Sequence, residues 1–343
     1  MSEYRYTVRH GDPPTPPYQA SEPPLPYPTG WFCLGPSTLW KPGSVQTHRF
    51  MGRDIVVHRT RSGILQAQEA HCPHLGAHLG AGGHVDGELL VCPFHQFAFD
   101  TEGTCVRTPY GTPPKTGLEL LPSQERFGIV WVWHHPDEPT PTWDLPQTQG
   151  IDAGPLHRSI DLTGNPQEFV ENAVDYQHFP YMHGVTIQET APPEFGDTTA
   201  RVQLTITGIQ RIRHLPLLRD TRMELTMTLI GPGAIYATVD FPQYGVHAIQ
   251  WATATPIAPW RIRFWEITRV DLTISTAVPA ILSSNIARPV SAVLTRAMHE
   301  FGWNVSSQDL SIWNHKRFIP HPKLNNQDGP VGPYRHWIRR FYP

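Results

Sequence analysis

Two short loops that carry cysteine and histidine constrain the fold of this chain more than any other feature. The first reads Cys72-Pro73-His74, and the second follows seventeen residues later as Cys92-Pro93-Phe94-His95. Each loop offers one thiolate and one imidazole and is stiffened by proline. We therefore expect a fold that brings the two loops face to face around one small inorganic centre.

Two kinds of centre use this set of ligands. One is a Cys2His2 zinc site. The other is a Rieske [2Fe–2S] cluster, in which two cysteines hold one iron and two histidines hold the other. Zinc knuckles usually pair Cys with Cys and His with His, whereas each loop here contributes one of each, which favours the cluster over zinc. The other two cysteines, Cys33 and Cys105, have no histidine at ligand spacing, and we expect both to be structural.

Composition narrows the fold class and the class of partner. The 343 residues include 37 prolines, which argues against a helical bundle and favours sheet and loops. With 27 basic and 30 acidic residues, the chain lacks a general basic field for nucleic acid. The most apolar late stretch, residues 277–293, is interrupted by polar residues and falls short of the ~20 apolar residues of a spanning helix. We expect no nucleic-acid partner, no integral membrane segment and a cytoplasmic location.

Proline clusters and strand signals divide the chain into three regions. Residues 1–30 form a proline-rich arm. Residues 31–137 contain short strand-like runs separated by glycine turns, which predicts a small all-β domain. A second proline cluster at 136–146 marks a linker, and residues 138–343 form the second domain. The predicted fold class is α+β.

The second domain changes to longer strands and helices. Asn165-Pro166 predicts a helix start, with the helix running from Gln167 to His178 and ending before Pro180. A second helical segment is predicted from Pro289 to about His315. Between them lie five strand candidates rich in Thr, Val and Ile, at Ala200–Thr207, Arg222–Ile230, Ala234–Phe241, Val246–Ala254 and Arg261–Arg269. This pattern predicts an antiparallel sheet flanked by helices.

A second group of polar residues lies on the first predicted helix and just after it. It reads Asn172-x-x-Asp175-x-x-His178-x-x-x-x-His183, with Asp175 and His178 on one helix face. Two histidines and a carboxylate from elsewhere form the facial triad of non-haem Fe(II) oxygenases. In a chain with 19 histidines, such a pair arises about equally well by chance. Its position after a predicted electron-carrying cluster favours the iron site.

Taken together, these motifs resemble those of the Rieske non-haem iron oxygenases. The resemblance rests on Cys72-x-His74, Cys92-x-x-His95 and Asn172-Ala-Val-Asp175-Tyr-Gln-His178-Phe-Pro-Tyr-Met-His183, and it extends over almost the whole chain after Trp31. Residues 103–110 and the tail motifs at 308–316, 328–331 and 334–342 are similar to the 3-ketosteroid 9α-hydroxylase and cholesterol 7-desaturase branch. The resemblance implies a Rieske domain followed by a helix-grip-like catalytic domain.

The resemblance also implies roles for individual residues. Cys72, His74, Cys92 and His95 match the ligands of the [2Fe–2S] cluster. The ligands of a mononuclear Fe(II) are matched by His178, His183 and Asp309. The carboxylate that bridges a catalytic histidine to a cluster histidine of the neighbouring subunit corresponds to Asp175. Asn172 lies beside the site, and a plain helix-face amide is an equally good interpretation of it.

The implied partners follow from what the chain lacks. It has no G-x-G-x-x-G fingerprint, so a separate NAD(P)H-dependent reductase or a ferredoxin must supply electrons for the reaction with O2. The bridge between subunits implies a ring, and we expect a homotrimer. Two other classes stay open, namely a Rieske-type electron carrier and a zinc-bound interaction module.

The substrate is the least constrained part of the interpretation. The chain shows no cluster of arginines for a strongly anionic substrate, which favours a bulky, apolar, steroid-like molecule and its hydroxylation. The alternative is a desaturase or oxidative demethylase of the same family that acts on a non-steroid natural product or an aromatic compound. Eight strand residues are candidates for the pocket wall, although each fits sheet packing at least as well: Ile235, Tyr236, Val239, Phe241, Ile249, Trp251, Phe264 and Trp265.

Overall fold

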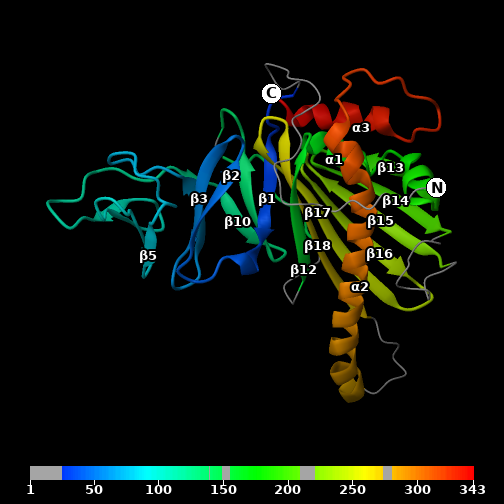
Figure 1. Cartoon of the computed structure of the whole chain (residues 1–343), viewed down its shortest axis with the longest axis horizontal. Coiled ribbons are helices and arrows are strands. Elements are labelled where there is room, and N and C mark those ends of the chain that lie inside the picture. The colour runs from blue at the N-terminus through cyan, green and yellow to red at the C-terminus, as the bar shows by residue number, and fades with distance from the viewer. Residues whose placement is uncertain (1–24, 139, 149–154, 209–220, 273–279) are drawn as a thin grey trace.

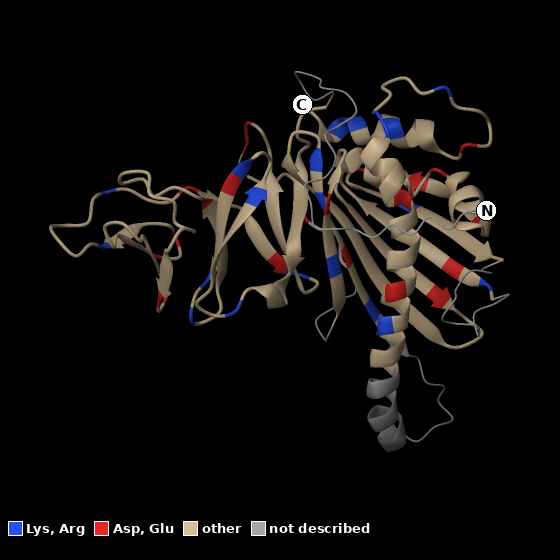
Figure 2. Cartoon of the chain, in the orientation of Figure 1, with Lys and Arg blue, Asp and Glu red and all other residues tan. Residues whose placement is uncertain are grey.

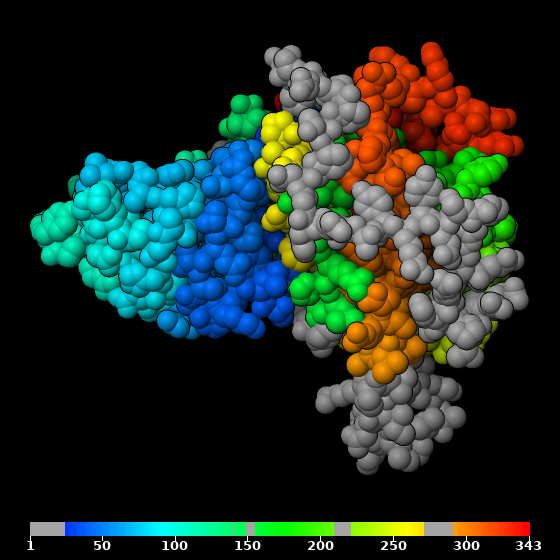
Figure 3. Space-filling model, in the orientation of Figure 1, coloured from blue at the N-terminus to red at the C-terminus, as the bar shows by residue number. Residues whose placement is uncertain are grey.

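The computed structural model describes residues 25–138, 140–148, 155–208, 221–272 and 280–343, and most of the predicted proline-rich arm lies outside them. The first part of the chain forms a lobe that projects from the side of the larger second part (Figures 1 and 3). Basic and acidic residues are interspersed over both parts (Figure 2). All strand pairs in the four sheets are antiparallel.

The first lobe is built from three small sheets, which confirms the predicted all-β fold. One sheet has the order β1-β11-β10, with β1 at Gly30–Pro36, β10 at Ser123–Arg126 and β11 at Ile129–His134. The next has the order β2-β3-β4-β9, at Val45–Phe50, Arg53–Arg59, Leu65–Glu69 and Leu120–Leu121. The third is β5-β6-β7-β8, at His84–Asp86, Leu89–Val91, Ala98–Phe99 and Cys105–Arg107. A 3-10 turn covers Ser37–Leu39.

The second part contains one large sheet of seven strands in the order β12-β18-β17-β16-β15-β14-β13. In chain order, strands β12 to β18 cover Leu156–Thr163, Thr186–Phe195, Thr199–Thr207, Met223–Ile230, Ala234–Phe241, Val246–Ala258 and Arg261–Leu272. All five predicted strands are present, but the prediction missed the two edge strands, β12 and β13. Both are polar, and β13 contains Pro192 and Pro193 within an irregular register. Proline and charge are typical of edge strands and hide the alternation that reveals a strand.

The helices lie on one side of this sheet. Helix α2, Ala280–His315, crosses the sheet face, and the short helix α3, Val331–Ile338, lies near the end of the chain (Figure 1). A last 3-10 turn covers Arg339–Phe341. The predicted start of α2 at Pro289 was wrong, because the helix begins at Ala280.

The first helix is much shorter than predicted. Helix α1 covers Pro166–Glu171, and Asn165 caps it through a hydrogen bond from the Glu168 amide. Beyond Glu171 the backbone tightens into turns, and the Tyr176 amide donates to the carbonyl of Asp328 in another loop. A π-helical turn, Phe179–His183, follows. The prediction that Asp175 and His178 share a face of one helix was therefore wrong, because the chain turns tightly after Glu171 and the Tyr176 amide bonds Asp328 instead of continuing the helix.

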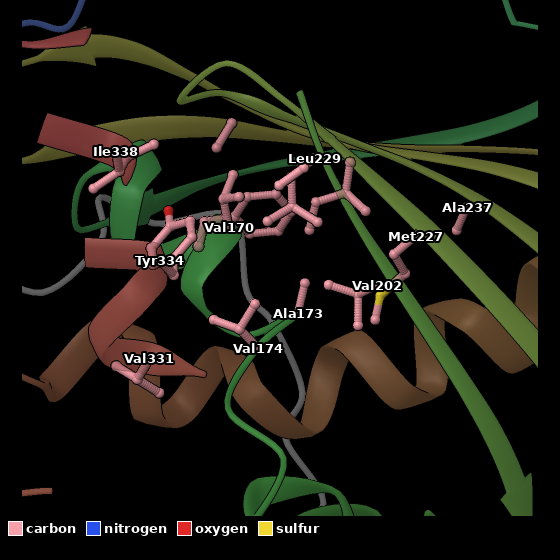
Figure 4. Packing of buried hydrophobic residues seen from close by; sticks show 14 of the residues in the cluster. Val170, Ala173, Val174, Val202, Met227, Leu229, Ala237, Val331, Tyr334 and Ile338 are labelled. Carbon is pink, nitrogen blue, oxygen red and sulfur yellow. The ribbon is translucent and has the colours of Figure 1, made fainter. Parts of the chain in front are cut away.

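Two of the five hydrophobic clusters in the described part of the chain position the elements around the large sheet and join the two parts of the chain. The first fills the space between the large sheet, α1 and α3, where Val170, Leu229 and Tyr334 are buried (Figure 4). The second joins the two parts of the chain, since Trp131 and Trp133 of β11 pack with Trp251 of β17 and Ile267 of β18. The backbone adds a bond across this junction from the Met51 amide to the Pro256 carbonyl. The two parts are therefore packed as one body.

Candidate metal centres and substrate cavity

The two Cys/His loops have the same backbone hydrogen bonds although their Cys-to-His spacing differs. The amides of Cys72 and Cys92 each donate to the carbonyl five residues later, and each cysteine carbonyl accepts from the amide four residues later. The residues at that fourth position, Gly76 and Gln96, both have a positive φ, of 74° and 56°. The loops are thus two copies of one turn at the end of the first lobe, which Figure 1 shows on the side away from the large sheet.

The four predicted ligands of these loops converge. Cys72 and Cys92 are buried side by side, and burial raises the pKa of the Cys72 thiol to about 11. The rings of His74 and His95 are half-buried, with centroids 4.7 Å apart, and His74 stacks on Phe97. Two adjacent thiols and two adjacent imidazoles are the ligand set of a cluster with one Cys-bound and one His-bound iron. Cys33 and Cys105 are buried in separate hydrophobic clusters.

The second centre is assembled from the π-helical turn and α2. Ligand atoms of His178, His183 and Asp309 all lie within 4.8 Å of one another. His183 Nε2 is 3.6 Å from Asp309 Oδ2, which is beyond hydrogen-bond distance, although both residues are buried. Two imidazoles and one carboxylate that converge without bonding to each other fit a facial triad for Fe(II).

The residues around this triad orient its side chains. Asn172 Nδ2 donates to Asp309 Oδ2 over 3.1 Å. His178 Nδ1 bonds the backbone carbonyl of Asp175, which leaves Nε2 available as a ligand atom. Burial lowers the pKa of His178, which favours the neutral imidazole that binds a metal. Gly184, with φ 65°, closes the π-helical turn directly after His183.

We expected the Asp175 carboxylate to contact His178, but the structure shows a different contact between the two residues. The backbone carbonyl of Asp175, rather than its carboxylate, accepts the hydrogen bond from the imidazole. The side chain is half-buried, and burial raises the pKa of its carboxyl group. Its predicted bridging role therefore stays a prediction.

An apolar cavity opens beside His183. It has a volume of about 130 Å³ and is open to solvent at its mouth. Its wall comes from the π-helical turn, the large sheet and α2, and includes Phe179, Leu225, Val239, Met298 and Phe301.

The structure corrects most of the predicted pocket wall. Of the eight candidate strand residues, Val239 alone lines this cavity. Trp251, Ile249 and Trp265 pack in the junction between the two parts of the chain, because their strand faces point toward the first lobe. Ile235 and Phe264 lie in the core around α1. Strand periodicity gives the face of a side chain only relative to its neighbours, so it could not distinguish the two sides of the sheet.

A polar group behind the cavity wall was not predicted from the sequence. Glu266 on β18 has no exposed surface, and Ser306 on α2 donates a hydrogen bond to its Oε2 over 2.9 Å. Gln250, Ser306 and Thr268 are polar members of the wall itself. The sequence signal that could have revealed this group is the single glutamate within the predicted strand Arg261–Arg269.

Comparisons with known proteins place this architecture in a family. A model of the Rieske [2Fe-2S] domain matches residues 30–123. A model described as the 3-ketosteroid 9alpha-hydroxylase C-terminal domain matches residues 132–342, more than half of the chain. The chain is a Rieske oxygenase of this 3-ketosteroid 9α-hydroxylase family.

Similar proteins cover nearly the whole of this Rieske oxygenase. The oxygenase component of a 3-ketosteroid-9-alpha-monooxygenase from Rhodococcus rhodochrous is 28% identical over 100% of this chain and 89% of its own. A cholesterol 7-desaturase from Drosophila melanogaster is 28% identical over 93% of this chain and 76% of its own. Dicamba monooxygenase bound to dicamba has the same fold, with a TM-score of 0.61 at 15% identity over 91% of this chain and 96% of that one.

Family membership establishes the enzyme class and the cofactors. The protein is a non-haem iron monooxygenase that uses a Rieske [2Fe–2S] cluster and a mononuclear iron. As an oxygenase component it works with a reductase or ferredoxin partner. In the described part of the chain, no helix combines the length and the apolar character needed to cross a bilayer.

Proposed function

We propose that this Rieske oxygenase hydroxylates a bulky, apolar, steroid-like substrate with O2 and with electrons that a separate reductase or ferredoxin takes from NAD(P)H. The observation that carries the proposal is the apolar cavity with His183 in its wall. A substrate in this cavity lies directly beside the triad of His178, His183 and Asp309. The names of two similar proteins, a 3-ketosteroid-9-alpha-monooxygenase oxygenase component and a cholesterol 7-desaturase, support a steroid-like substrate.

The ligand assignment is part of the proposal. Cys72, Cys92, His74 and His95 hold the cluster in a domain of residues 31–137, and the triad holds the mononuclear iron in a domain of residues 138–343. When bound, these groups supply single electrons and the activation of dioxygen. The protein's own residues orient the ligands, through Asn172 and the Asp175 carbonyl, and keep water away with the apolar wall.

We also propose that the working unit is a homotrimer. The cluster loops lie at the far end of the first lobe from the triad (Figure 1), and the tryptophan-rich junction fixes this separation within one chain. Near the cluster ligands, Leu75 and Phe94 are 66% and 62% exposed, and Tyr181 beside the triad is 85% exposed. In the proposed trimer, these side chains would be covered where the subunits meet. In the trimer, Asp175 links His178 to His74 or His95 of the partner subunit.

Turnover on a panel of steroids tests the proposed reaction. The enzyme, supplied with a generic reductase, NADH and O2, should convert a 3-ketosteroid or a sterol to a product heavier by one oxygen atom. The alternative reaction, desaturation, has the support of the cholesterol desaturase relatives and gives a product lighter by two hydrogens. Oxidation of a non-steroid aromatic or natural product, with every steroid left unchanged, would overturn the substrate assignment.

Metal analysis tests the two centres against the rival interpretations. About three irons and about two acid-labile sulfides per chain are expected, whereas zinc without sulfide would contradict the ligand assignment. The variant His183→Ala should keep the spectrum of the cluster and lose substrate oxidation. A simple electron carrier would be unaffected by this change.

A further inference from the structure

A buried carboxyl group lies directly behind the wall of the apolar cavity. Glu266 is fully buried, and the side chain of Gln250 lies beside its carboxyl group. Its Oε2 is bonded to the hydroxyl of Ser306, which is part of the cavity wall. Ser306 precedes Asp309 by three residues on α2, so the two side chains share a helix face. A chain of two groups thus leads from a buried acid to the neighbourhood of the triad.

The reaction of the proposed function needs protons at this place. Hydroxylation of a C–H bond follows R–H + O2 + 2 e⁻ + 2 H⁺ → R–OH + H2O, with the electrons supplied by the reductase. The protons must enter a cavity whose wall is mostly apolar and holds few polar side chains. In the cavity wall that the structure describes, Ser306 is the hydroxyl bonded to a carboxyl group.

We propose that Glu266 and Ser306 form the proton-delivery pair of the active site. When Glu266 is protonated at Oε2, the hydrogen bond reverses: Oε2 donates to Ser306 Oγ, and the Ser306 hydroxyl turns toward the cavity. The carboxyl then gives its proton to Ser306 Oγ while the Ser306 hydroxyl passes its own proton to the oxygen being reduced in the cavity. The Glu266 carboxylate then takes a proton from solvent, and the pair is ready for the next transfer. This inference rests on the proposed function, because it assigns the proton source of that reaction.

The surroundings of Glu266 suit an acid that cycles between its two forms. Burial raises its pKa to about 7, against smaller lowering by the Ser306 hydrogen bond, by Arg158 and by the Gln250 hydrogen bond. Arg158 is its cross-strand neighbour on β12 and forms an ion pair with Glu300 of α2. On the remaining sides lie His299 of α2, 3.9 Å from Oε1, and Gln250 of β17.

The half-exposed ion pair of Arg158 and Glu300 marks the side from which protons return. Glu300 raises the pKa of Glu266, and Arg158 lowers it. Gly302 covers the acid on the cavity side, since a Cβ there would lie 2.9 Å from Glu266 Oε1 and 2.4 Å from Gln250 Nε2. The missing side chain lets α2 approach the acid closely enough for the Ser306 bond.

Four variants of the holoenzyme test the pair. Glu266→Gln keeps the shape and the hydrogen bond but cannot release a proton. Ser306→Ala removes the hydroxyl, and Ser306→Thr restores it. Glu168→Gln is the matched control, because Glu168 is another buried glutamate with a pKa raised by burial, but it is paired with Lys316 away from the cavity.

Two readouts separate this inference from the proposed function. The first is the infrared band of a protonated carboxyl group in the resting enzyme, which should titrate near neutral pH and vanish in Glu266→Gln. The second is product formed per O2 consumed. It should fall by roughly tenfold or more in Glu266→Gln and Ser306→Ala, with peroxide released instead, and recover in Ser306→Thr.

The infrared band decides the inference even if no steroid on the panel is a substrate. The absence of such a band from the difference between the wild-type and Glu266→Gln spectra overturns it. So does unchanged coupling of product to O2 in Glu266→Gln, as seen in the Glu168→Gln control. Failure of wild-type turnover with the band present would instead count against the proposed substrate alone.

Discussion

At the scale of single residues, Asn172 tests how the triad is held in place. Its amide donates to Asp309 Oδ2, and it joins the end of α1 to α2. The variant Asn172→Ala should weaken iron binding by about 10- to 100-fold, as the loss of an outer hydrogen bond to a metal ligand commonly does. Titration of the iron-depleted protein with Fe(II), at constant cluster content, measures the effect.

The matched control is Asn304→Ala. Asn304 is an exposed asparagine on the same helix, and its amide bonds the backbone carbonyl of Glu300. Iron affinity should be unchanged in this variant. Equal loss of affinity in both variants would show that helix stability, rather than the bond to Asp309, determines occupancy.

The buried Glu266 carboxyl should also make the free energy of unfolding depend on pH. Its pKa is about 7 in the folded chain and about 4.5 when exposed. Below pH 4.5 both states hold the proton, while between pH 4.5 and 7 the unfolded chain alone releases it, so the folded state loses stability as the pH rises. The variant Glu266→Gln should therefore gain on the order of 3 kcal/mol relative to wild type over this interval.

Urea unfolding of the holoenzyme at pH 5 and pH 8 measures this difference. Glu88→Gln is a control of opposite sign, because a hydrogen bond from Ser62 lowers the pKa of Glu88. A stability difference for Glu266→Gln that does not change with pH would mean that the buried acid is ionised throughout.

At the scale of elements, the π-helical turn positions His183, and Gly184 ends it. Gly184 has φ 65°, and a Cβ there would meet nothing within 4 Å, so Gly184→Ala should act through backbone strain alone. We expect a loss of about 1 kcal/mol, seen as a shift of Tm by about 2–4 °C. Because His183 is adjacent, the iron content should also fall.

Gly111→Ala provides the comparison for this substitution. Gly111 has φ 64° and equally open space, but it lies in the first lobe. Its stability loss should be similar, with iron in the triad unaffected. A triad that keeps full iron occupancy in Gly184→Ala would show that the turn does not set the position of His183.

The elements also show what the sequence could predict. The loops at Cys72 and Cys92 were identified because ligand spacing and proline are local properties. The end of α1 at Glu171 was not identified, because the chain there goes into tight turns and then bonds Asp328 through the Tyr176 amide, and Asp328 is distant in sequence. Asp309 was named through the resemblance alone. Glu266 and Ser306 were missed because their contact joins β18 to α2, and no local pattern reports such a pair.

At the scale of the whole molecule, the junction between the two parts determines how electrons can travel. Trp131 and Trp251 are fully buried there, with ring centroids 5.4 Å apart, and Thr255 Oγ1 donates to the Cys33 carbonyl. A dense core of this kind does not permit the lobe to swing toward the triad of its own chain. Transfer between protomers is the arrangement that such rigidity favours.

Complementation between two inactive variants tests this arrangement. His183→Ala disables the iron site and leaves the cluster, while Cys92→Ser disables the cluster and leaves the iron site. Each variant alone should be inactive. Trimers assembled from both during co-expression should regain activity, because an intact triad can then face an intact cluster across a boundary. Random assembly at equal amounts predicts activity at about a quarter of the sites.

The control is the double variant Cys92→Ser/His183→Ala co-expressed with His183→Ala. No intact triad exists in that mixture, so it should stay inactive. Transfer within one chain predicts that the first pair is equally inactive, since neither chain then contains both centres. Recovery in mixed trimers, isolated through two different affinity tags, would therefore separate the two routes by activity alone. If well-folded mixed trimers with full iron and sulfide in the intact sites do not oxidise substrate, the route through Asp175 of the partner subunit is refuted.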